Sequence, residues 1–343
     1  MKKLFLHIVL FLSIVLAICV GLDILYKHII PQKIAEKAYW IWQQKPKKYD
    51  YIILGSSRAE SSFNCAVFDS ICNSSGINLA INGAGLAENE MVLKHFLEKN
   101  STSILFLELD EANLSPQNHL SYPFHDYVYF PYMNDPLIDS YIQQYEKRKH
   151  YYIWKYIPFV KYAEFNAKFS LDKLINHEHI DTIIDSKGFR PFINHQSTYT
   201  FIDLEGNFLD KRYWYLADYS SPKSQYEIID SLSVMAIHNI IQICNKNKIQ
   251  LVFYCAPSHA GHFKKCKYNS LNKFDFINKM AQKEHLPFIN FSYWKYNQVD
   301  SFYYDYSHPN TNGARAMTSI FSYYYKNNLQ SDSTFLHFFN DHF

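Results

Sequence analysis

Two short segments near opposite ends of the chain carry the residue types of a serine nucleophile and its base. Ser57 closes the run Gly-Ser-Ser that starts at Gly55, and Asp305 precedes His308 by three positions. That spacing lets the Asp305 carboxylate reach Nδ1 of the imidazole and fix its tautomer, so that Nε2 can take the proton of a serine hydroxyl. Together the segments predict nucleophilic catalysis by a serine, with Ser57, His308 and Asp305 as the catalytic residues.

Neighbouring residues leave alternatives open within this hypothesis. Ser56 is an alternative nucleophile, one position before Ser57. Arg58 either binds an anionic group of a substrate or pairs with an acidic side chain on its helix. Two close pairs of histidines, at 177–179 and 259–262, lack the spacing of a helical zinc site, so we expect neither a metal nor another cofactor.

The segments need a fold that brings them together, and the hydrophobic pattern predicts alternating strands and helices. Helices are expected from about residue 60, at 89–98 and at 313–327. Buried strands are expected at residues 51–54, 77–81, 103–109, 251–256 and 286–291. This order is typical of an α/β three-layer sandwich, in which helices cover both faces of a mostly parallel central sheet. Such folds bind ligands beyond the carboxyl ends of their strands, and Ser57 follows one of them.

The alternation stops at about residues 114–223, a stretch rich in aromatic residues, His and Pro. We expect a cap inserted after the third strand, which either binds a ligand or only shields the sheet. Residues 201–208 suggest a hairpin within it. Four aromatic side chains are candidates for stacking on sugar rings, with core packing as the alternative: Tyr129, Tyr132, Trp214 and Tyr215.

The amino terminus predicts a membrane anchor. Residues 4–22 are apolar except for His7 and Ser13, and a helix of roughly 20 residues spans a bilayer core. Since no A-x-A cleavage site follows, we expect an uncleaved signal anchor at residues 1–25, a stalk at 26–50 and a domain at 51–343. Lysines precede the apolar segment and also follow it, so charge alone does not fix its orientation.

The composition excludes a nucleic-acid partner. Lys and Arg total 34 and Asp and Glu total 32, so the formal net charge of +2 provides no basic surplus for a phosphate backbone. Hydrophobic residues make up 48% of the 343 residues, which is enough for a full core.

Cysteine spacing suggests two disulfides for a domain in an oxidising compartment. The pairs that lie close in sequence are Cys65 with Cys72 and Cys255 with Cys266. Sequence alone does not determine connectivity, so these pairs remain a hypothesis.

The segments around Ser57 and His308 resemble blocks of the SGNH (GDSL-like) hydrolase superfamily. The Gly-Ser-Ser run resembles its first block, which implies Ser57 as nucleophile and as an oxyanion donor. Gly83 resembles its second block, which implies a backbone N–H for the oxyanion, with Gly85 as the alternative. Asp305 and His308, followed by Pro-Asn-Thr-Asn-Gly-Ala, resemble its fifth block. The resemblance covers roughly residues 50–113 and 228–328.

The third block departs from the family pattern. Those hydrolases usually carry Gly-x-Asn-Asp after the third strand, with the Asn as an oxyanion donor. Here the run is Glu-Leu-Asp-Glu from Glu108, with Asn113 slightly beyond. An ionised Asp110 would repel an oxyanion, so either Asn113 substitutes or one donor is missing. Losing one donor costs about 3 kcal/mol in the barrier.

Three features together resemble membrane-anchored SGNH-like proteins of alginate and wall-polymer O-acylation: the unusual third block, the Gly-Ser-Ser-Arg turn and the amino-terminal anchor. This resemblance implies an O-acyltransferase or esterase that acts on a cell-surface glycan, in the periplasm or at the cell surface, beside a membrane-bound O-acyltransferase. Two other classes stay open. A catalytically weak or inactive scaffold protein is favoured by the unusual third block, whereas the anchor and the polar aromatic cap argue against a lipase or thioesterase.

Overall fold

The computed structural model describes residues 1–33, 36–115, 126–145, 148–164, 184–192, 228–305 and 307–328. The chain divides into two compact units. Unit 1 comprises Met1–Gln44 and His125–Ile180, and unit 2 comprises Lys45–Phe124 and Asp181–Phe343. The expected hairpin at residues 201–208 lies outside the described residues, as do Trp214 and Tyr215.

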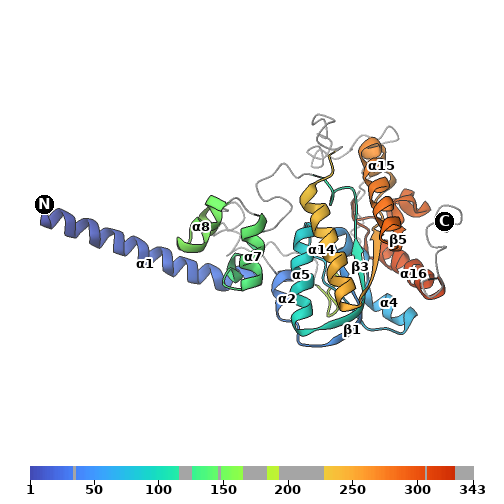
Figure 1. The fold of residues 1–343 in the computed structure, drawn as a ribbon, viewed down its shortest axis with the longest axis horizontal. Coiled ribbons are helices and arrows are strands. Elements are labelled where there is room, and N and C mark those ends of the chain that lie inside the picture. Colours follow the sequence, from blue (N-terminus) through green and yellow to red (C-terminus); the bar gives the residue numbers. More distant parts are fainter. Residues whose placement is uncertain are drawn as a thin grey trace. The chain divides into compact units, whose positions relative to one another are not determined.

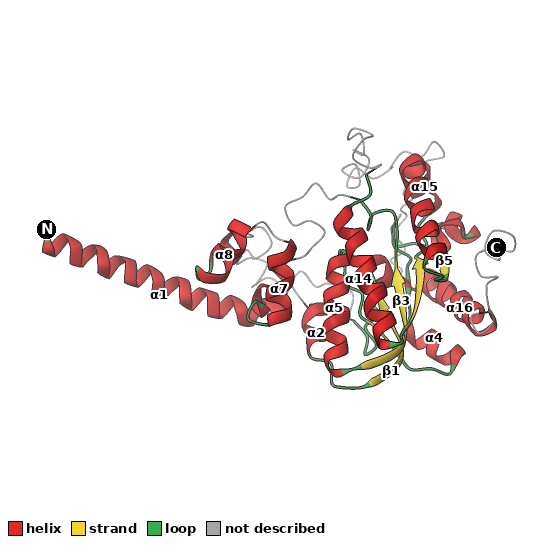
Figure 2. Ribbon diagram, viewed as in Figure 1, coloured by secondary structure: helices red, strands yellow, loops and turns green. Residues whose placement is uncertain are grey.

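Unit 2 is built on a five-stranded, all-parallel sheet (Figure 2). Its strands are β1 (Lys48–Leu54), β2 (Gly76–Asn78), β3 (Ser101–Glu108), β4 (Gln250–Cys255) and β5 (Phe288–Asn290). The spatial order is β2-β1-β3-β4-β5, so the chain moves outward from β1 to β2 and then returns to the other side of β1. In open α/β sheets the ligand site lies where the order reverses, which is here between β1 and β3.

Helices cover both faces of the sheet, as the alternating pattern predicts (Figures 1 and 2). On one face α5 (Leu86–Lys99) packs against α14 (Ser231–Asn247). On the other, α16 (Thr311–Asn328) packs against α3 (Ser57–Ser62) and α4 (Cys65–Cys72). A further helix, α15 (Ala260–Lys283), joins β4 to β5.

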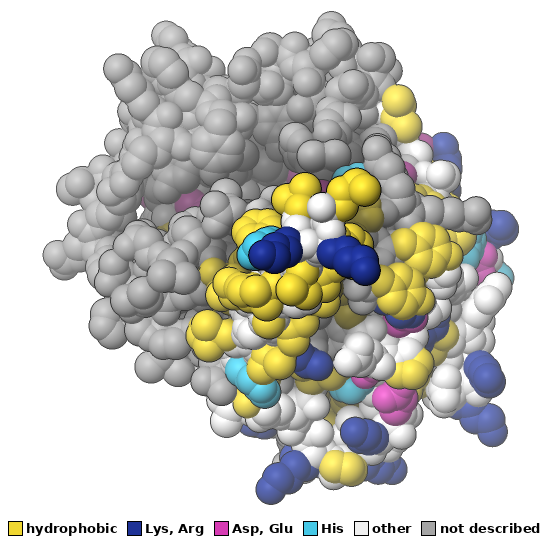
Figure 3. Space-filling model, turned by 90° about the vertical axis from the view of Figure 1, so that its left-hand side faces the viewer, with side chains coloured by type: hydrophobic (Ala, Val, Ile, Leu, Met, Phe, Trp, Pro, Cys, Tyr) yellow, Lys and Arg dark blue, Asp and Glu magenta, His cyan; other side chains and the backbone are white. Residues whose placement is uncertain are grey.

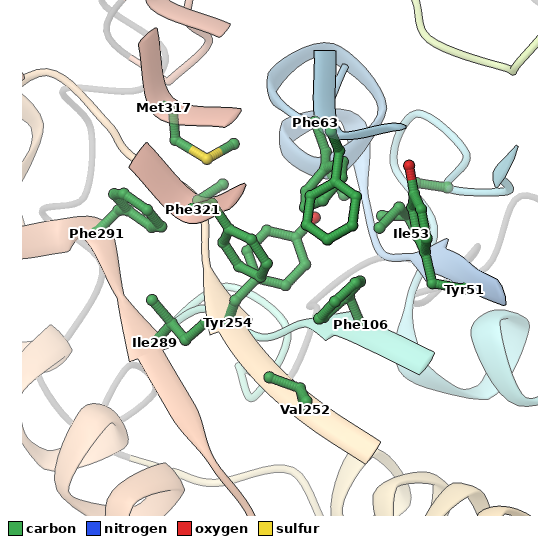
Figure 4. Packing of buried hydrophobic residues seen from close by; sticks show 14 of the residues in the cluster. Tyr51, Ile53, Phe63, Phe106, Val252, Tyr254, Ile289, Phe291, Met317 and Phe321 are labelled. Carbon is green, nitrogen blue, oxygen red and sulfur yellow. The ribbon is translucent and has the colours of Figure 1, made fainter. Parts of the chain in front are cut away.

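The core beneath α16 is largely aromatic (Figure 4). Phe106 of β3 meets Phe321 of α16 edge to face, with ring centroids 5.0 Å apart, and Phe63 meets the same ring at 5.1 Å. All three rings are fully buried. Burying a Phe side chain stabilises a fold by roughly 1.5–3 kcal/mol, so this cluster fixes α3 and α16 against the same part of the sheet.

The predicted disulfides are wrong. Cys65, Cys72 and Cys255 are free thiols, which excludes both proposed pairs. Cys65 begins α4 and Cys72 ends it, and a rise of 1.5 Å per residue separates their Cα atoms by about 10 Å along the helix axis. A disulfide needs Cα atoms within about 7 Å. Closeness in sequence therefore does not bring these two thiols together.

Unit 1 begins with one long apolar helix, α1 (Lys2–Lys33). Among the described residues, Lys2–Ile30 is the segment long and apolar enough to cross a membrane, with a mean hydropathy of 2.9. Figure 3 faces its amino-terminal end and shows hydrophobic side chains gathered around it. The other elements described in this unit are helices: α2 (Glu36–Trp42), α6 (Asp126–Tyr129), η1 (Phe130–Tyr132), α7 (Pro136–Tyr145), α8 (Arg148–Tyr156) and α9 (Val160–Glu164).

Candidate active site

A tight turn carries the chain from β1 into α3 and places Ser57 as the first residue of that helix. Gly55 makes the turn possible, since a Cβ at this position would lie 2.5 Å from Cβ of Glu108 and 2.6 Å from Cβ of Ala59. The Gly55 N–H donates to Oδ1 of Asn89 at 2.9 Å, which ties the turn to α5. The half-buried Ser57 therefore stands at the carboxyl end of a central strand.

Ser57 lies in one hydrogen-bonded chain with His308 and Asp305. Its Oγ is 2.8 Å from Nε2 of His308. The other ring nitrogen, Nδ1, is 2.8 Å from Oδ2 of Asp305 and 2.9 Å from Oδ1. This is the arrangement in which an imidazole accepts a serine proton while a carboxylate holds its tautomer.

The loop itself keeps the Asp305 carboxylate in place. Oδ1 accepts the backbone N–H groups of Ser307 at 2.7 Å and His308 at 2.8 Å. Burial raises the pKa of Asp305, but the adjacent imidazole and the two N–H donors lower it by more, so it lies below its ordinary 3.8. Asp305 is therefore ionised at neutral pH and suited to hold an Nδ1 proton.

The residues that follow His308 fix this loop against α16. Asn310 accepts the N–H groups of Asn312 and Gly313 through Oδ1, at 3.0 and 3.1 Å. Its Nδ2 donates to the carbonyl of Ser301 at 2.7 Å. A Cβ at Gly313 would lie 2.1 Å from the carbonyl oxygen of Phe302, so only glycine fits. These contacts explain why Asn310 and Gly313 stand in the Pro-Asn-x-x-Gly run.

Ser56, the alternative nucleophile, has a different position. Its hydroxyl donates to Oε2 of Glu108 at 3.0 Å and accepts the N–H of Arg58 at 3.3 Å, which caps α3. The Ser56 hydroxyl is thus used inside the turn, while the Ser57 hydroxyl reaches the imidazole.

Arg58 is buried beneath the turn and forms ion pairs there. Its Nη1 lies 2.6 Å from Oδ2 of Asp110 and 3.8 Å from Oε2 of Glu111, and its Nη2 donates to the carbonyl of Ala256 at 2.8 Å. The Arg58 side chain is 7% exposed, and its charge meets the acids after β3. This corresponds to the ion-pair alternative for Arg58, although its partners lie in a loop and not on a helix.

The residues that follow β3, from Asp110 to Asn113, form a closed turn. The N–H of Asp110 donates to Oδ1 of Asn113, and the N–H of Asn113 donates to Oδ1 of Asp110, both at 2.8 Å. The charge of Asp110 is compensated by Arg58, which reduces the repulsion of an oxyanion that the sequence alone predicts. The Asn113 side-chain oxygen is occupied in the turn, which leaves its NH₂ group as the possible donor.

Glu108, at the end of β3, is a site residue that sequence reasoning missed. Its Oε2 accepts both the N–H of Ser56 at 3.1 Å and the Ser56 hydroxyl. Burial and the nearby Asp110 raise the pKa of Glu108 to about 8, although Arg58 and the Ser56 donors lower it. The protonated form is therefore favoured at neutral pH. An acidic residue that ends a buried apolar strand was the available signal.

Two aromatic rings beside His308 were also missed. Phe192 stacks on Tyr304 with centroids 4.6 Å apart and an interplanar angle of 11°, and its ring is 5.3 Å from that of His308. Thr311 holds the Phe192 carbonyl through its N–H at 3.0 Å and its hydroxyl at 2.9 Å. Nothing local in the sequence marks Phe192, because long-range contacts bring it to the site.

The predicted second block lies in the turn after β2. Ile81 donates its N–H to the Gly55 carbonyl at 3.2 Å, which sets this turn beside the one that carries Ser57. Gly83 is exposed and has a φ of 75°, a left-handed conformation that glycine favours. Gly85, the alternative donor, is the N-cap residue of α5.

Two of the four predicted sugar-stacking residues, Tyr129 and Tyr132, belong to unit 1. Tyr129 is fully buried in unit 1, with its ring 5.4 Å from Trp42 and 6.1 Å from Tyr141. Tyr132 stacks on Trp42 at 5.9 Å. Tyr129 is a core residue of unit 1, as the alternative for the aromatic stretch predicts, whereas Tyr132 is half-buried.

Comparison with models of known protein families found no match, and comparison with curated proteins found no similar sequence. The chemistry of the site is therefore inferred from its geometry: a Ser–His–Asp hydrogen-bonded chain at the carboxyl edge of a parallel sheet.

Proposed function

We propose that the protein is a membrane-anchored, SGNH-like O-acyltransferase or esterase that acts on a cell-surface glycan outside the cytoplasm. The observation that carries this proposal is the row of hydrogen bonds from Ser57 through His308 to Asp305. Nε2 of His308 lies 2.8 Å from Oγ of Ser57, and Nδ1 lies 2.8 Å from Oδ2 of Asp305. No metal or other cofactor takes part in the proposed reaction.

The proposed reaction has two halves. First, His308 takes the Ser57 proton through Nε2 as Oγ attacks the acyl carbonyl, and it then protonates the departing alcohol to leave an acyl-serine. Second, His308 takes a proton from a glycan hydroxyl, or from water, which attacks the acyl-serine carbonyl. Ser57 departs with the proton returned by His308, and the product is an acylated glycan or a free acid.

Three groups are proposed to stabilise the oxyanion: the backbone N–H of Ser57, the backbone N–H of Gly83 and the side-chain NH₂ of Asn113. The ion pair between Arg58 and Asp110 supports activity, because it compensates a negative charge close to this region. Acyl groups would be supplied from the membrane, for which a membrane-bound O-acyltransferase is the proposed partner.

Covalent labelling of the serine tests this proposal. A fluorophosphonate probe should modify the full-length protein at Ser57, and Ser57→Ala should abolish the modification. Ser56→Ala is the matched control, since it removes the neighbouring hydroxyl and leaves the nucleophile. A folded protein that is not modified at Ser57 would contradict the assignment.

Cells provide the second test. Ser57→Ala should lower the acyl content of the surface polymer at unchanged protein level. The competing proposal is a non-catalytic scaffold, which the Glu-Leu-Asp-Glu run in place of Gly-x-Asn-Asp favours. Undiminished acylation by Ser57→Ala would support the scaffold.

A reporter fusion tests the topology. A reporter that works only after export should be active when it is fused after Phe343, whereas a reporter that works only in the cytoplasm should be inactive there.

A further inference from the structure

Helix α8 of unit 1 is apolar on two faces. Its inner face is buried, with Trp154 packed on Phe130 at a ring distance of 5.0 Å. Its outer face is also apolar but lies open to the surroundings. Four side chains form this outer surface, the α8 patch: Tyr152 (51% exposed), Ile153 (40%), Tyr156 (69%) and Ile157 (49%). Contiguous exposed apolar side chains of this kind mark a surface that binds a partner or a membrane.

The α8 patch is attached to the helix that the sequence assigns to the membrane. Just after the patch, the N–H of Phe159 donates to Oδ1 of Asp23 in α1 at 2.9 Å, and Nζ of Lys161 pairs with the same oxygen at 2.6 Å. The ring of Tyr26 meets that of Phe159 at 5.1 Å. Asp23 is the first acidic residue of α1 and follows its apolar segment directly. These contacts hold the end of α8 at the level where α1 becomes polar.

The exposed apolar surface of α1 extends past Asp23. Ile24 is 54% exposed and Leu25 is 47% exposed, and they extend the apolar surface of residues 4–20 past Asp23. Figure 1 shows α8 beside this part of α1. The α8 patch therefore lies next to the boundary between the apolar and polar parts of the anchor.

We propose that the α8 patch lies in the interfacial layer of the bilayer that α1 crosses, as a second contact between unit 1 and the lipid. Tyrosine rings favour this layer, where the ring meets acyl chains and the hydroxyl meets headgroups. Interfacial helices carry cationic side chains beside their apolar face, and Lys155, which pairs with Oδ2 of Asp139 at 2.6 Å, lies between the two tyrosines in sequence. The proposal rests on α1 crossing the membrane and is independent of the catalytic proposal.

Photocrosslinking in lipid tests this inference. Benzoylphenylalanine is placed at Tyr156 of the full-length protein in vesicles of phosphatidylcholine and phosphatidylglycerol, and lipid adducts are counted by mass spectrometry. The matched control is Tyr323 of α16, which is 59% exposed and has the same side chain. Adducts at position 156 should exceed those at 323 at least several-fold. Position 152 is a second probe on the same face.

Three outcomes overturn the inference. A probe at Ile14, within α1, reports whether the anchor is in the bilayer at all. Lipid adducts at 14 without adducts at 152 or 156 leave the anchor in place and reject the interfacial patch. No adducts at 14 reject the membrane span itself. If the probe at 156 in cells links to a protein and not to lipid, the patch binds a protein partner.

Discussion

Oγ of Ser57 lies 2.8 Å from Nε2 of His308, although 251 positions separate the two residues in the sequence. Ser57 follows β1, an interior strand, whereas His308 precedes α16, the last described helix. The aromatic core around Phe321 packs α16 against α3, and this packing brings the two side chains within hydrogen-bonding distance. The site therefore depends on contacts that form between the two ends of unit 2.

Ser57→Ala and His308→Ala should lower esterase turnover by similar factors, on the order of 10⁴ or more, and the double variant should add little. The hydroxyl and the imidazole act in one proton transfer, so losing either one removes the step. Turnover of 4-nitrophenyl acetate by the full-length protein measures this. If the two losses multiply in the double variant, the residues act independently and the proposed mechanism is wrong.

Asp305→Asn should reduce turnover by about 10⁴, because an amide no longer holds the required tautomer of His308. It should also alter the pH dependence of stability. The pKa of Asp305 is lower in the folded chain than its ordinary 3.8, so the ionised carboxylate stabilises the fold above that value, and the contribution is lost as pH falls through the folded pKa.

The difference in free energy of unfolding between wild type and Asp305→Asn should therefore be largest near neutral pH and shrink in acid. Thermal unfolding in detergent at several pH values measures it. Ser307→Ala, which keeps the backbone donor to Asp305, is the control and should show no such trend. A difference that grows in acid would contradict the assigned ionisation.

Glu108→Gln should make unit 2 more stable than wild type as pH rises. The folded pKa of Glu108 is raised to about 8 from an ordinary 4.5, so the folded state binds the extra proton and wild type loses stability between these two values. Arg58 and Asp110, the charged groups nearest Glu108, remain in both proteins. The free energies of unfolding of wild type and of Glu108→Gln, measured from pH 5 to 9, should diverge as pH rises to about 8 and should differ by a constant amount above it.

Glu108→Ala is the informative counterpart. It leaves the N–H and hydroxyl of Ser56 without their acceptor and should cost about 1–3 kcal/mol at pH 5, where the carboxyl of folded wild type is protonated. If the Gln variant is as unstable as the Ala variant at pH 5, the carboxyl has a role beyond neutral hydrogen bonding to Ser56.

Phe192→Ala should weaken activity on acetylated oligosaccharides more than activity on 4-nitrophenyl acetate. Phe192 and Tyr304 form a flat wall beside His308, and an aromatic stacking contact is worth up to about 1.5 kcal/mol, or about tenfold in kcat/KM. The ratio of kcat/KM on the oligosaccharide to kcat/KM on 4-nitrophenyl acetate should fall about tenfold. Tyr323→Ala, an exposed ring on α16, is the control. Equal losses on both substrates would show that the wall does not bind the sugar.

The hydrogen-bonded group of Ser57, His308 and Asp305 could be predicted because the signals are local. Gly55 and Ser57 follow an apolar strand, and Asp305 and His308 have a spacing that permits a hydrogen bond within one loop. The parallel sheet then requires the strand ends to share an edge. The alternation of apolar segments likewise predicts the α/β sheet, because buried parallel strands have continuous apolar runs.

The rest of the site depends on distant contacts that no local pattern records. Residues 184–192 reach His308 because Arg190 pairs with Glu60 of α3 at 3.0 Å and the Asn78 N–H donates to the Lys187 carbonyl at 2.8 Å. Aromatic composition does not distinguish a buried tyrosine such as Tyr129 from a ring at a binding surface. Arg58 and Asp110 likewise have charges whose pairing becomes visible only in the folded chain.

The order in which the parts of the site occur along the chain has a consequence for biosynthesis. The ribosome makes Ser57 roughly 250 residues before it makes His308, and α16 follows later still. A nascent chain that ends before residue 308 therefore contains the serine turn but no base to activate it. Proteolytic fragments that lose this end have the same defect. Under the proposed mechanism, a chain gains hydrolytic activity only after His308 and α16 have been made, and a shorter nascent chain has no base with which to activate Ser57.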